Sequence, residues 1–254
     1  MTQSTPILIG HRGARGEAPE NTLQGFEWAW RNGIHSFEFD LQLSSDNEIY
    51  ILHDEDLART CGVSGRAADR TLAELVTLDA RKVGPPWPVE CHIPALKDVL
   101  DLLLQAPDSV EQVQLEVKST DTNTLMRLCD QLTTMLGELP PNLLEKCVVT
   151  SFHPLVPQLV QKAGVKGLRQ GLAVEVEKVL QALLKTPSPP YDIVALNHQM
   201  VSREVVDQLR AKGLAVSTWT VNASQDWQRV CDAGVDSVIT DYPLRMQQIL
   251  QDRF

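Results

Sequence analysis

Residues 34–43, IHSFEFDLQL, place acidic side chains on one face of a predicted β-strand. Apolar residues alternate there with Glu38, Asp40 and Gln42, and alternate side chains of a strand share a face. Taken alone, this alternation is typical of a strand at the edge of an antiparallel sheet, with its polar face in water. Paired carboxylates are also cation ligands, so the rest of the chain must decide between the two interpretations.

Other residues able to do chemistry stand at or near the ends of further apolar runs. They are His11 and Arg12 after 7–10, His53 at the end of 48–53, Glu116 and Lys118 in 113–118, Trp219 in 214–221, and Asp241 after 236–240. Each has an ordinary structural interpretation as well. His11 and Trp219 could be core residues, Glu116 and Lys118 a simple ion pair, and Asp241 the N-cap of the last helix.

Eight short apolar runs alternate with longer amphipathic stretches. The predicted strands cover 7–10, 36–43, 113–118, 147–152, 167–174, 192–197, 214–221 and 236–240, and a run at 48–53 is expected to pair beside the second strand. The predicted helices cover 21–33, 95–106, 121–137, 154–164, 175–185, 202–212, 223–233 and 243–252. In the first helix, Asn21 is the predicted N-cap, and Gln24 would complete a capping box.

This alternation predicts an α/β protein, a (β/α)₈ TIM barrel. No linker divides the chain, so residues 1–254 are expected to form a single domain, with residues 54–94 as a small irregular loop elaboration after strand 2. TIM-barrel active sites lie at the C-terminal ends of the strands. A closed barrel has no edge strand, and buried acids are costly unless they are paired or bind a metal. Glu38, Asp40 and Glu116 are therefore predicted to surround a cation.

Carboxylate ligands without cysteine favour Mg²⁺ or Ca²⁺ over Zn²⁺. Three carboxylates, one divalent cation, Arg12 and Lys118 together carry a formal charge of +1. Such a site suits a monoanionic phosphodiester, and the fork of Arg12 fits two phosphate oxygens. His11 and His53 are candidates for proton transfer to and from the reacting oxygens.

The composition narrows the range of partners. The formal net charge of −10 disfavours nucleic acid and anionic membranes. No apolar run approaches the roughly 18–20 residues that span a bilayer, and the N-terminus does not resemble a secretory signal. Five cysteines without a C-x-x-C pair disfavour a disulfide framework and a zinc site. We therefore expect a cytoplasmic protein without stable membrane insertion; nothing in the sequence indicates its oligomeric state.

Several motifs occur in an order that resembles the glycerophosphodiester phosphodiesterases, especially the short cytoplasmic bacterial type. They are GHRGARGEAPENTLQGF, EFD, ILHDEDLART, HIPALKDVL, LEVK, WTVN and TDYP, from Ile9 to about Pro243. The resemblance implies a TIM barrel that hydrolyses small-molecule glycerophosphodiesters to sn-glycerol 3-phosphate and an alcohol. It also implies one divalent cation, Mg²⁺ or Ca²⁺, as cofactor.

The same resemblance implies roles for individual residues. The implied acid–base catalysts are His11 and His53, the implied metal ligands are Glu38, Asp40 and Glu116, and the implied substrate-binding or supporting residues are Arg12, Lys118, Trp219, Glu20 and Asn21. Residues 54–94 match no fixed pattern, which leaves the alcohol open.

Three other functions remain as alternatives at this point. A phospholipase C-like enzyme uses the same fold and two histidines but forms a cyclic phosphate. A non-catalytic barrel could bind phosphorylated ligands, although no histidine or carboxylate of the motifs is missing. A metal-dependent sugar isomerase could share the barrel, but it would not need the paired HRG and HD motifs.

Overall fold

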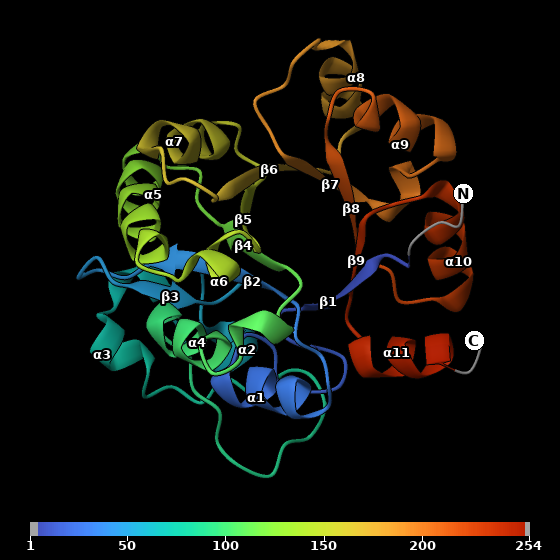
Figure 1. Cartoon of the computed structure of the whole chain (residues 1–254). Coiled ribbons are helices and arrows are strands. Elements are labelled where there is room, and N and C mark those ends of the chain that lie inside the picture. Colours follow the sequence, from blue (N-terminus) through green and yellow to red (C-terminus); the bar gives the residue numbers. More distant parts are fainter. Residues whose placement is uncertain (1–4, 252–254) are drawn as a thin grey trace.

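A computed structural model describes residues 5–251, which form a parallel β-barrel surrounded by helices (Figure 1). Within this range β1 pairs with both β9 and β2, which closes the ring in the order β1-β9-β8-β7-β6-β5-β4-β2. The strands are β1 Ile7–His11, β2 Phe37–Leu43, β3 Ile49–Ile51, β4 Val113–Val117, β5 Cys147–Ser151, β6 Arg169–Val174, β7 Ile193–Asn197, β8 Ala215–Trp219 and β9 Ser237–Thr240. The predicted (β/α)₈ TIM barrel is confirmed.

Helices cover the outside of the barrel (Figure 1). The longer ones are α1 Leu23–Arg31, α4 Leu96–Leu103, α5 Thr122–Gly137, α7 Leu155–Ala163, α8 Glu177–Lys185, α9 Arg203–Arg210, α10 Ser224–Ala233 and α11 Pro243–Gln251. Shorter elements are α2 Ala58–Cys61, α3 Leu72–Leu75, α6 Pro141–Leu144, and the 3₁₀ turns η1 Ala67–Asp69, η2 Pro107–Ser109 and η3 His198–Met200. Within the described range, no helix is long and apolar enough to cross a membrane.

The two faces of β2 have different partners. Phe37 and Phe39 pack edge-to-face on Phe26 of α1, with ring centroids 5.4 and 5.5 Å apart. Alternation directs Glu38 and Asp40 to the opposite face, inside the barrel. All seven residues of β2 are buried, so the interpretation of this stretch as a solvated edge strand is excluded.

Antiparallel β3 extends the sheet beside β2, as predicted for the run at 48–53. Gln42, the third polar residue of β2, donates from Nε2 to the carbonyl oxygens of Leu52 and Asp54 at 2.7 and 2.8 Å. These bonds fix the segment that carries His53 against the end of β2.

Residues 54–94 contain α2, η1 and α3 and have a small hydrophobic cluster of their own. Its buried members, some contributed by the adjoining β3 region, are Tyr50, Leu52, Leu57, Cys61, Ala67, Leu75, Ala80 and Ile93. The elaboration after strand 2 is therefore confirmed, and it is more ordered than the predicted irregular loop. Its packing holds a defined surface beside the carboxyl end of β2.

The predicted N-cap of the first helix is wrong by one residue. Thr22 caps α1, because its Oγ1 accepts from the backbone N–H of Gly25 at 3.0 Å. Asn21 instead has a left-handed backbone, with φ of 52°. Its Nδ2 donates to Asp40 Oδ2 at 2.8 Å, so tertiary contact with the barrel overrides its capping preference.

Candidate active site

A tight turn after β1 presents His11 and Arg12 at the carboxyl end of the barrel. A Cβ atom on Gly10 would lie 1.8 Å from the carbonyl oxygen of Gly13, so only glycine permits this close approach. Arg12 has φ of 50°, a conformation that L-residues with long side chains rarely adopt. This turn places the Arg12 guanidinium against the carboxylates of Glu20 and Asp40.

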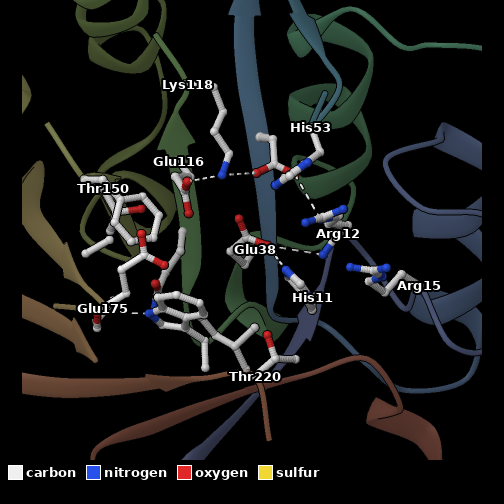
Figure 2. A pocket seen from close by; sticks show the side chains of 17 residues that line it. His11, Arg12, Arg15, Glu38, His53, Glu116, Lys118, Thr150, Glu175 and Thr220 are labelled. Atoms are coloured by element: carbon white, nitrogen blue, oxygen red, sulfur yellow. Dashed lines mark hydrogen bonds and ion pairs between the residues drawn. The ribbon is translucent and has the colours of Figure 1, made fainter. Parts of the chain in front are cut away.

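Three carboxylates converge inside the barrel from two adjacent strands, and Figure 2 labels two of them, Glu38 and Glu116. Asp40 of β2 is in register with Glu116 of β4, and Glu38 lies one inward position earlier. Each residue offers an oxygen within 4.8 Å of the others. Oε1 of Glu38 is buried and has no hydrogen-bond partner among the described residues. The set offers only oxygen ligands and leaves one of them unsatisfied, which fits a hard divalent cation.

The electrostatics of the trio disfavour the ionised form of its two glutamates. Burial raises the pKa of Glu38 well above its usual value, and repulsion from Asp40 and Glu116 raises it further. Burial likewise raises the pKa of Glu116. For Asp40, burial is outweighed by Lys118 and Arg12, which lower its pKa to about 2. A divalent cation would reverse the cost of ionising both glutamates.

Arg12 connects the β1 turn to the acids. Its Nε lies 3.3 Å from Asp40 Oδ2, and its NH1 donates to Glu20 Oε1 at 3.0 Å. Glu20 also accepts from Arg59 NH2 at 2.6 Å. Among the described residues, Glu20 and Asn21 do not line the cavity at the site. Through these contacts Glu20 holds Arg12, and Asn21 holds Asp40, in place.

His11 is oriented by Asp241, from the opposite end of the sequence. Its Nδ1 lies 2.5 Å from Asp241 Oδ1, and Asn222 Nδ2 donates to Asp241 Oδ2 at 2.8 Å. The first turn of α11 is capped instead by Glu17, whose oxygens accept from the backbone N–H groups of residues 244 and 245. The interpretation of Asp241 as the N-cap of the last helix is therefore wrong.

His53 has a carboxylate partner next to it in the sequence. Its Nδ1 lies 2.8 Å from Asp54 Oδ1, and Asp54 Oδ2 accepts from Arg59 Nε. An ionised carboxylate can only accept, so in both histidines the Nδ1 atom carries a proton and the neutral ring keeps Nε2 as its basic atom. Burial lowers the pKa of His11 and of His53.

Lys118 lies between two of the acids (Figure 2). Its Nζ is 3.3 Å from Asp40 Oδ1 and also pairs with Glu116 Oε1. The same atom stands 5.6 Å from the centroid of the Phe152 ring. Burial opposes its charge, but the two carboxylates outweigh burial and raise the pKa of Lys118. Lys118 therefore remains charged.

The acidic trio, both histidines, Arg12 and Lys118 line a cavity of about 300 Å³ at the carboxyl ends of the strands. It is lined by His11, Arg12, Arg15, Glu38, Asp40, His53, Gln114, Glu116, Lys118, Thr150, Phe152, Ala173, Glu175, Ala195, Trp219, Thr220 and Ile239. Trp219 donates from Nε1 to the carbonyl oxygen of Ala195 at 3.0 Å, and its ring meets Phe152 edge-on at 5.5 Å. All the predicted catalytic residues and metal ligands thus border one cavity.

The sequence interpretation missed three charged residues of this region, Arg15, Arg59 and Glu175, and it assigned Asp241 to a helix cap. Arg15 lies in the HRGAR motif, Arg59 in the HDEDLART motif, and Asp241 in the TDYP motif, so proximity to a motif was an available signal for these three. Glu175 follows β6 directly, and its place at a strand end was the only signal for it.

A closed TIM barrel with a polar cavity at the carboxyl ends of its strands has the architecture of the barrel enzymes. The comparison with protein families is more specific. Residues 11–245 match the model of the Glycerophosphoryl diester phosphodiesterase family. The chain belongs to this family of phosphoric diester hydrolases, as its motifs predict.

Similar proteins agree with this assignment. The glycerophosphodiester phosphodiesterase of Caldanaerobacter subterraneus subsp. tengcongensis is 30% identical, with 93% of this chain and 94% of that protein aligned. The glycerophosphodiester phosphodiesterase of Bacillus subtilis is also 30% identical, over 93% of this chain and 84% of that protein.

Solved structures share the fold over the whole barrel. A phosphodiesterase from Oleispira antarctica, in complex with the product sn-glycerol-3-phosphate, superposes with a TM-score of 0.80 at 25% identity and covers 97% of each chain. The Thermotoga maritima glycerophosphodiester phosphodiesterase has a TM-score of 0.73 at 24% identity, covers 96% of this chain and 98% of that chain, and supports the fold.

Proposed function

We propose that the chain hydrolyses glycerophosphodiesters to sn-glycerol 3-phosphate and an alcohol, with a divalent cation at Glu38, Asp40 and Glu116 and with proton transfer by His11 and His53. The observation that carries the proposal is the convergence of this acidic trio, both histidines and Arg12 on one cavity. The product bound to the Oleispira antarctica relative supports the glycerol 3-phosphate half of the substrate.

The charge of the cavity supports the cation. Its lining carries four carboxylates, including Glu175, against Arg12, Arg15 and Lys118. A protonated His53 would only balance these charges, so without a further cation the cavity offers a phosphodiester monoanion no net positive charge. A bound Mg²⁺ or Ca²⁺ would make the net charge positive and stabilise the negative charge that develops on the phosphoryl oxygens.

Arg12 and Lys118 are positioned to bind the phosphate. The guanidinium of Arg12 is oriented by Glu20 and Asp40, and its fork matches two phosphoryl oxygens. The ammonium of Lys118 adds a point charge on the side of Glu116. Both cations are paired with carboxylates, so their geometry is set before substrate binds.

The two histidines provide acid–base chemistry. One neutral imidazole accepts the proton of the attacking oxygen as the new P–O bond forms. The protonated imidazole of the other gives its proton to the oxygen of the departing alcohol as the old P–O bond breaks. Asp241 and Asp54 orient the two rings and stabilise their protonated forms. We assign the acid role to His53 and the base role to His11.

The test is product analysis. ³¹P NMR of reactions with several glycerophosphodiesters, with added Mg²⁺ or Ca²⁺ and then with chelator, should show sn-glycerol 3-phosphate that forms only when a cation is present. Accumulation of a cyclic phosphate would support the phospholipase C-like alternative. Tight binding of the diesters with no product under any cation condition would support a non-catalytic barrel. Either result would overturn the proposed hydrolysis.

A further inference from the structure

Arg59 of the elaboration contacts two carboxylates that serve different parts of the reaction centre. Its NH1 and NH2 donate to Oε2 and Oε1 of Glu20 at 3.2 and 2.6 Å, so both oxygens of this acid accept from one guanidinium. Its Nε donates to Oδ2 of Asp54. Arg59 therefore holds the two carboxylates through different nitrogens of one rigid plane.

Each of these carboxylates contacts a residue of the proposed mechanism on its other side. Oε1 of Glu20 accepts from Arg12 NH1 at 3.0 Å. Oδ1 of Asp54 lies 2.8 Å from His53 Nδ1. A continuous chain of hydrogen-bonded charged groups thus runs from the phosphate-binding arginine to the proposed general acid, and Arg59 is its central member.

The core of the elaboration fixes the backbone that carries Arg59. Arg59 lies in the first turn of α2, where the backbone N–H of Ala58 donates to Asp56 Oδ1 at 2.9 Å. Leu57 and Cys61 are buried in the hydrophobic cluster of the elaboration, whereas Arg59 is half-buried. An anchored backbone limits where the side chain can reach, so the elaboration sets the direction from which Arg59 contacts both acids.

We propose that Arg59 is a positioning residue, which holds the phosphate-binding guanidinium and the acid imidazole in their catalytic arrangement through the two carboxylates. Arg59 is not among the described residues that line the cavity, so it acts through its partners and not on the substrate. The inference rests on the proposed function, because it uses the roles of Arg12 and His53 given there. It assigns the elaboration a part in the chemistry.

Loss of Arg59 would leave both carboxylates with fewer partners. Burial raises the pKa of Glu20, and the bonds from Arg59 together with the charge of Arg12 outweigh burial and lower it. Asp54 accepts from Arg59 on one oxygen and contacts the His53 ring with the other. Without the guanidinium, only the ring itself would hold this carboxylate. The imidazole would then lose its fixed orientation toward the departing oxygen, and a misplacement of about 1 Å can cost about a hundredfold in rate.

Two leaving groups test the effect on His53. The methyl ester of glycerol 3-phosphate releases an alkoxide, which needs a proton from a general acid, whereas the p-nitrophenyl ester releases a stabilised phenolate, which needs little assistance. In Arg59→Gln we expect kcat for the methyl ester to fall about 10–100-fold. The fall for the p-nitrophenyl ester should be at least about tenfold smaller. A loss of folded protein would lower both rates by the same factor.

Product inhibition tests the effect on Arg12. sn-Glycerol 3-phosphate, added as a competitive inhibitor with Mg²⁺ or Ca²⁺ present, reports phosphate binding without proton transfer. Its inhibition constant should rise about three- to tenfold in Arg59→Gln, because a less firmly oriented guanidinium makes a weaker two-point contact with phosphate. A change in only one of the two readouts would overturn the joint role of Arg59.

Arg59→Lys separates geometry from charge. Lysine keeps the positive charge but cannot reproduce the rigid fork, so most of both losses should remain. Full recovery of both readouts in Arg59→Lys would show that charge alone suffices, and it would overturn positioning by the guanidinium. Should Arg59→Gln fail to fold, Arg59→Lys provides the same two comparisons with wild type.

The matched control is Arg81→Gln, in the same elaboration. Arg81 Nε donates to both oxygens of Asp79 at 3.0 and 2.9 Å, and its NH1 donates to the carbonyl oxygen of Trp87 at 2.8 Å. Arg81 thus has ionic and backbone contacts of its own, but none of them joins the chain that leads to the cavity. Arg81→Gln should leave both readouts unchanged. Equal losses in Arg81→Gln and Arg59→Gln would show a general effect of loosening the elaboration and would overturn the inference.

The outcomes separate this inference from the proposed function. Turnover of the methyl ester by wild type reports the hydrolysis, and a larger loss for the methyl than for the p-nitrophenyl ester in His53→Ala reports the acid role. If either is absent, the proposed function is wrong, whatever Arg59→Gln does. If both hold while Arg59→Gln keeps the wild-type ratio of the two rates and the wild-type inhibition constant, Arg59 does not position the site.

Discussion

The two halves of the barrel rim differ in charge. The half built from β1, β2, β4 and the elaboration carries both histidines, the acidic trio, Arg12 and Lys118. The half built from β5 to β8 contributes mainly neutral groups to the same cavity, namely Thr150, Phe152, Ala173, Ala195 and Trp219, with Glu175 as its one charged residue in the described lining. Most of the charged side chains therefore lie on one half of the barrel rim, and most of the neutral side chains that line the cavity lie on the other half.

This difference suggests a division between chemistry and binding. In the charged half, side chains hold one another through carboxylate contacts, as Glu20 holds Arg12 and Arg59. Such preorganised charges act on the transition state, where charge develops. The neutral half offers shape and an aromatic surface, which bind substrate and transition state alike. Substitutions in the charged half should therefore change kcat, and those in the neutral half should change KM.

The largest expected effect is removal of a histidine from the charged half. His11→Ala and His53→Ala should each lower kcat by about 10²–10⁴-fold, the usual contribution of a positioned acid or base, while leaving cation binding intact. A diester with a very good leaving group should partly rescue His53→Ala, the variant that lacks the proposed acid.

The matched control is His35→Ala, which removes a histidine ahead of β2 whose ring lies tilted against Trp30 at 4.5 Å between centroids. It should keep full kcat. Failure of a folded His11→Ala or His53→Ala protein to bind the cation would contradict the division between proton transfer and metal binding.

Arg12→Lys should have the next largest effect. An ammonium cannot reproduce a two-point contact with phosphate, and it would also release Glu20 and Asp40 from their shared partner. We expect kcat/KM to fall about 10–100-fold. Arg15→Lys, at the more exposed rim of the cavity, is the control and should lose much less; equal losses in the two variants would show that Arg12 is not the phosphate clamp.

Asp241→Asn should lower kcat at least about tenfold, because His11 loses the carboxylate that fixes its tautomer and stabilises its protonated form. Burial lowers the pKa of His11, and Asp241 counteracts it by stabilising the imidazolium. Without this charge the pKa of His11 falls further. His11 then stays neutral to lower pH but is a weaker base.

The pH profile of kcat/KM in wild type should be bell-shaped, with each histidine responsible for one limb. In Asp241→Asn the acidic limb should move to lower pH, because His11 is protonated only at lower pH in this variant. An acidic limb that stays in place while kcat falls would mean that Asp241 supports the fold rather than the imidazole.

The smallest expected effect comes from the neutral half. Trp219→Phe keeps an aromatic face but loses the bond from Nε1 to Ala195. We expect KM to rise about threefold with kcat nearly unchanged, on the scale of one neutral hydrogen bond. Trp28→Phe, on the outer surface of the barrel against Trp87, should change neither parameter. A large fall in kcat for Trp219→Phe would contradict the proposal that substitutions in the neutral half change KM rather than kcat.

Local pattern predicted much of this architecture. Alternation in β2 indicated which residues share the inner face, and the strand–helix repeat indicated the closed ring that brings Glu116 beside Asp40. The tertiary roles of single side chains could not be predicted in this way. Asn21 has good capping chemistry, but Asp40 draws its side chain into the barrel, so Thr22 caps the helix.

Asp241, the partner of His11, is a second side chain whose tertiary role could not be predicted from local pattern. Asp241 and His11 are 230 positions apart in sequence, and only closure of the barrel brings β9 beside β1. From the sequence, Asp241 before Pro243 fits a helix cap equally well. The order of the elaboration cannot be predicted from a sequence pattern either, because its small core is built from scattered residues without a regular period.

The most direct test of the account is calorimetric titration of Mg²⁺ or Ca²⁺ into chelator-treated protein, with glycerol 3-phosphate release measured on the same samples. Wild type should bind one cation per chain and recover activity in proportion. Glu116→Gln should bind more weakly and be partly rescued by excess cation, whereas Glu175→Gln, in the same cavity but outside the trio, should bind nearly normally. Full activity of verified cation-free wild type, or unchanged cation affinity in Glu116→Gln, would contradict a metal site at Glu38, Asp40 and Glu116.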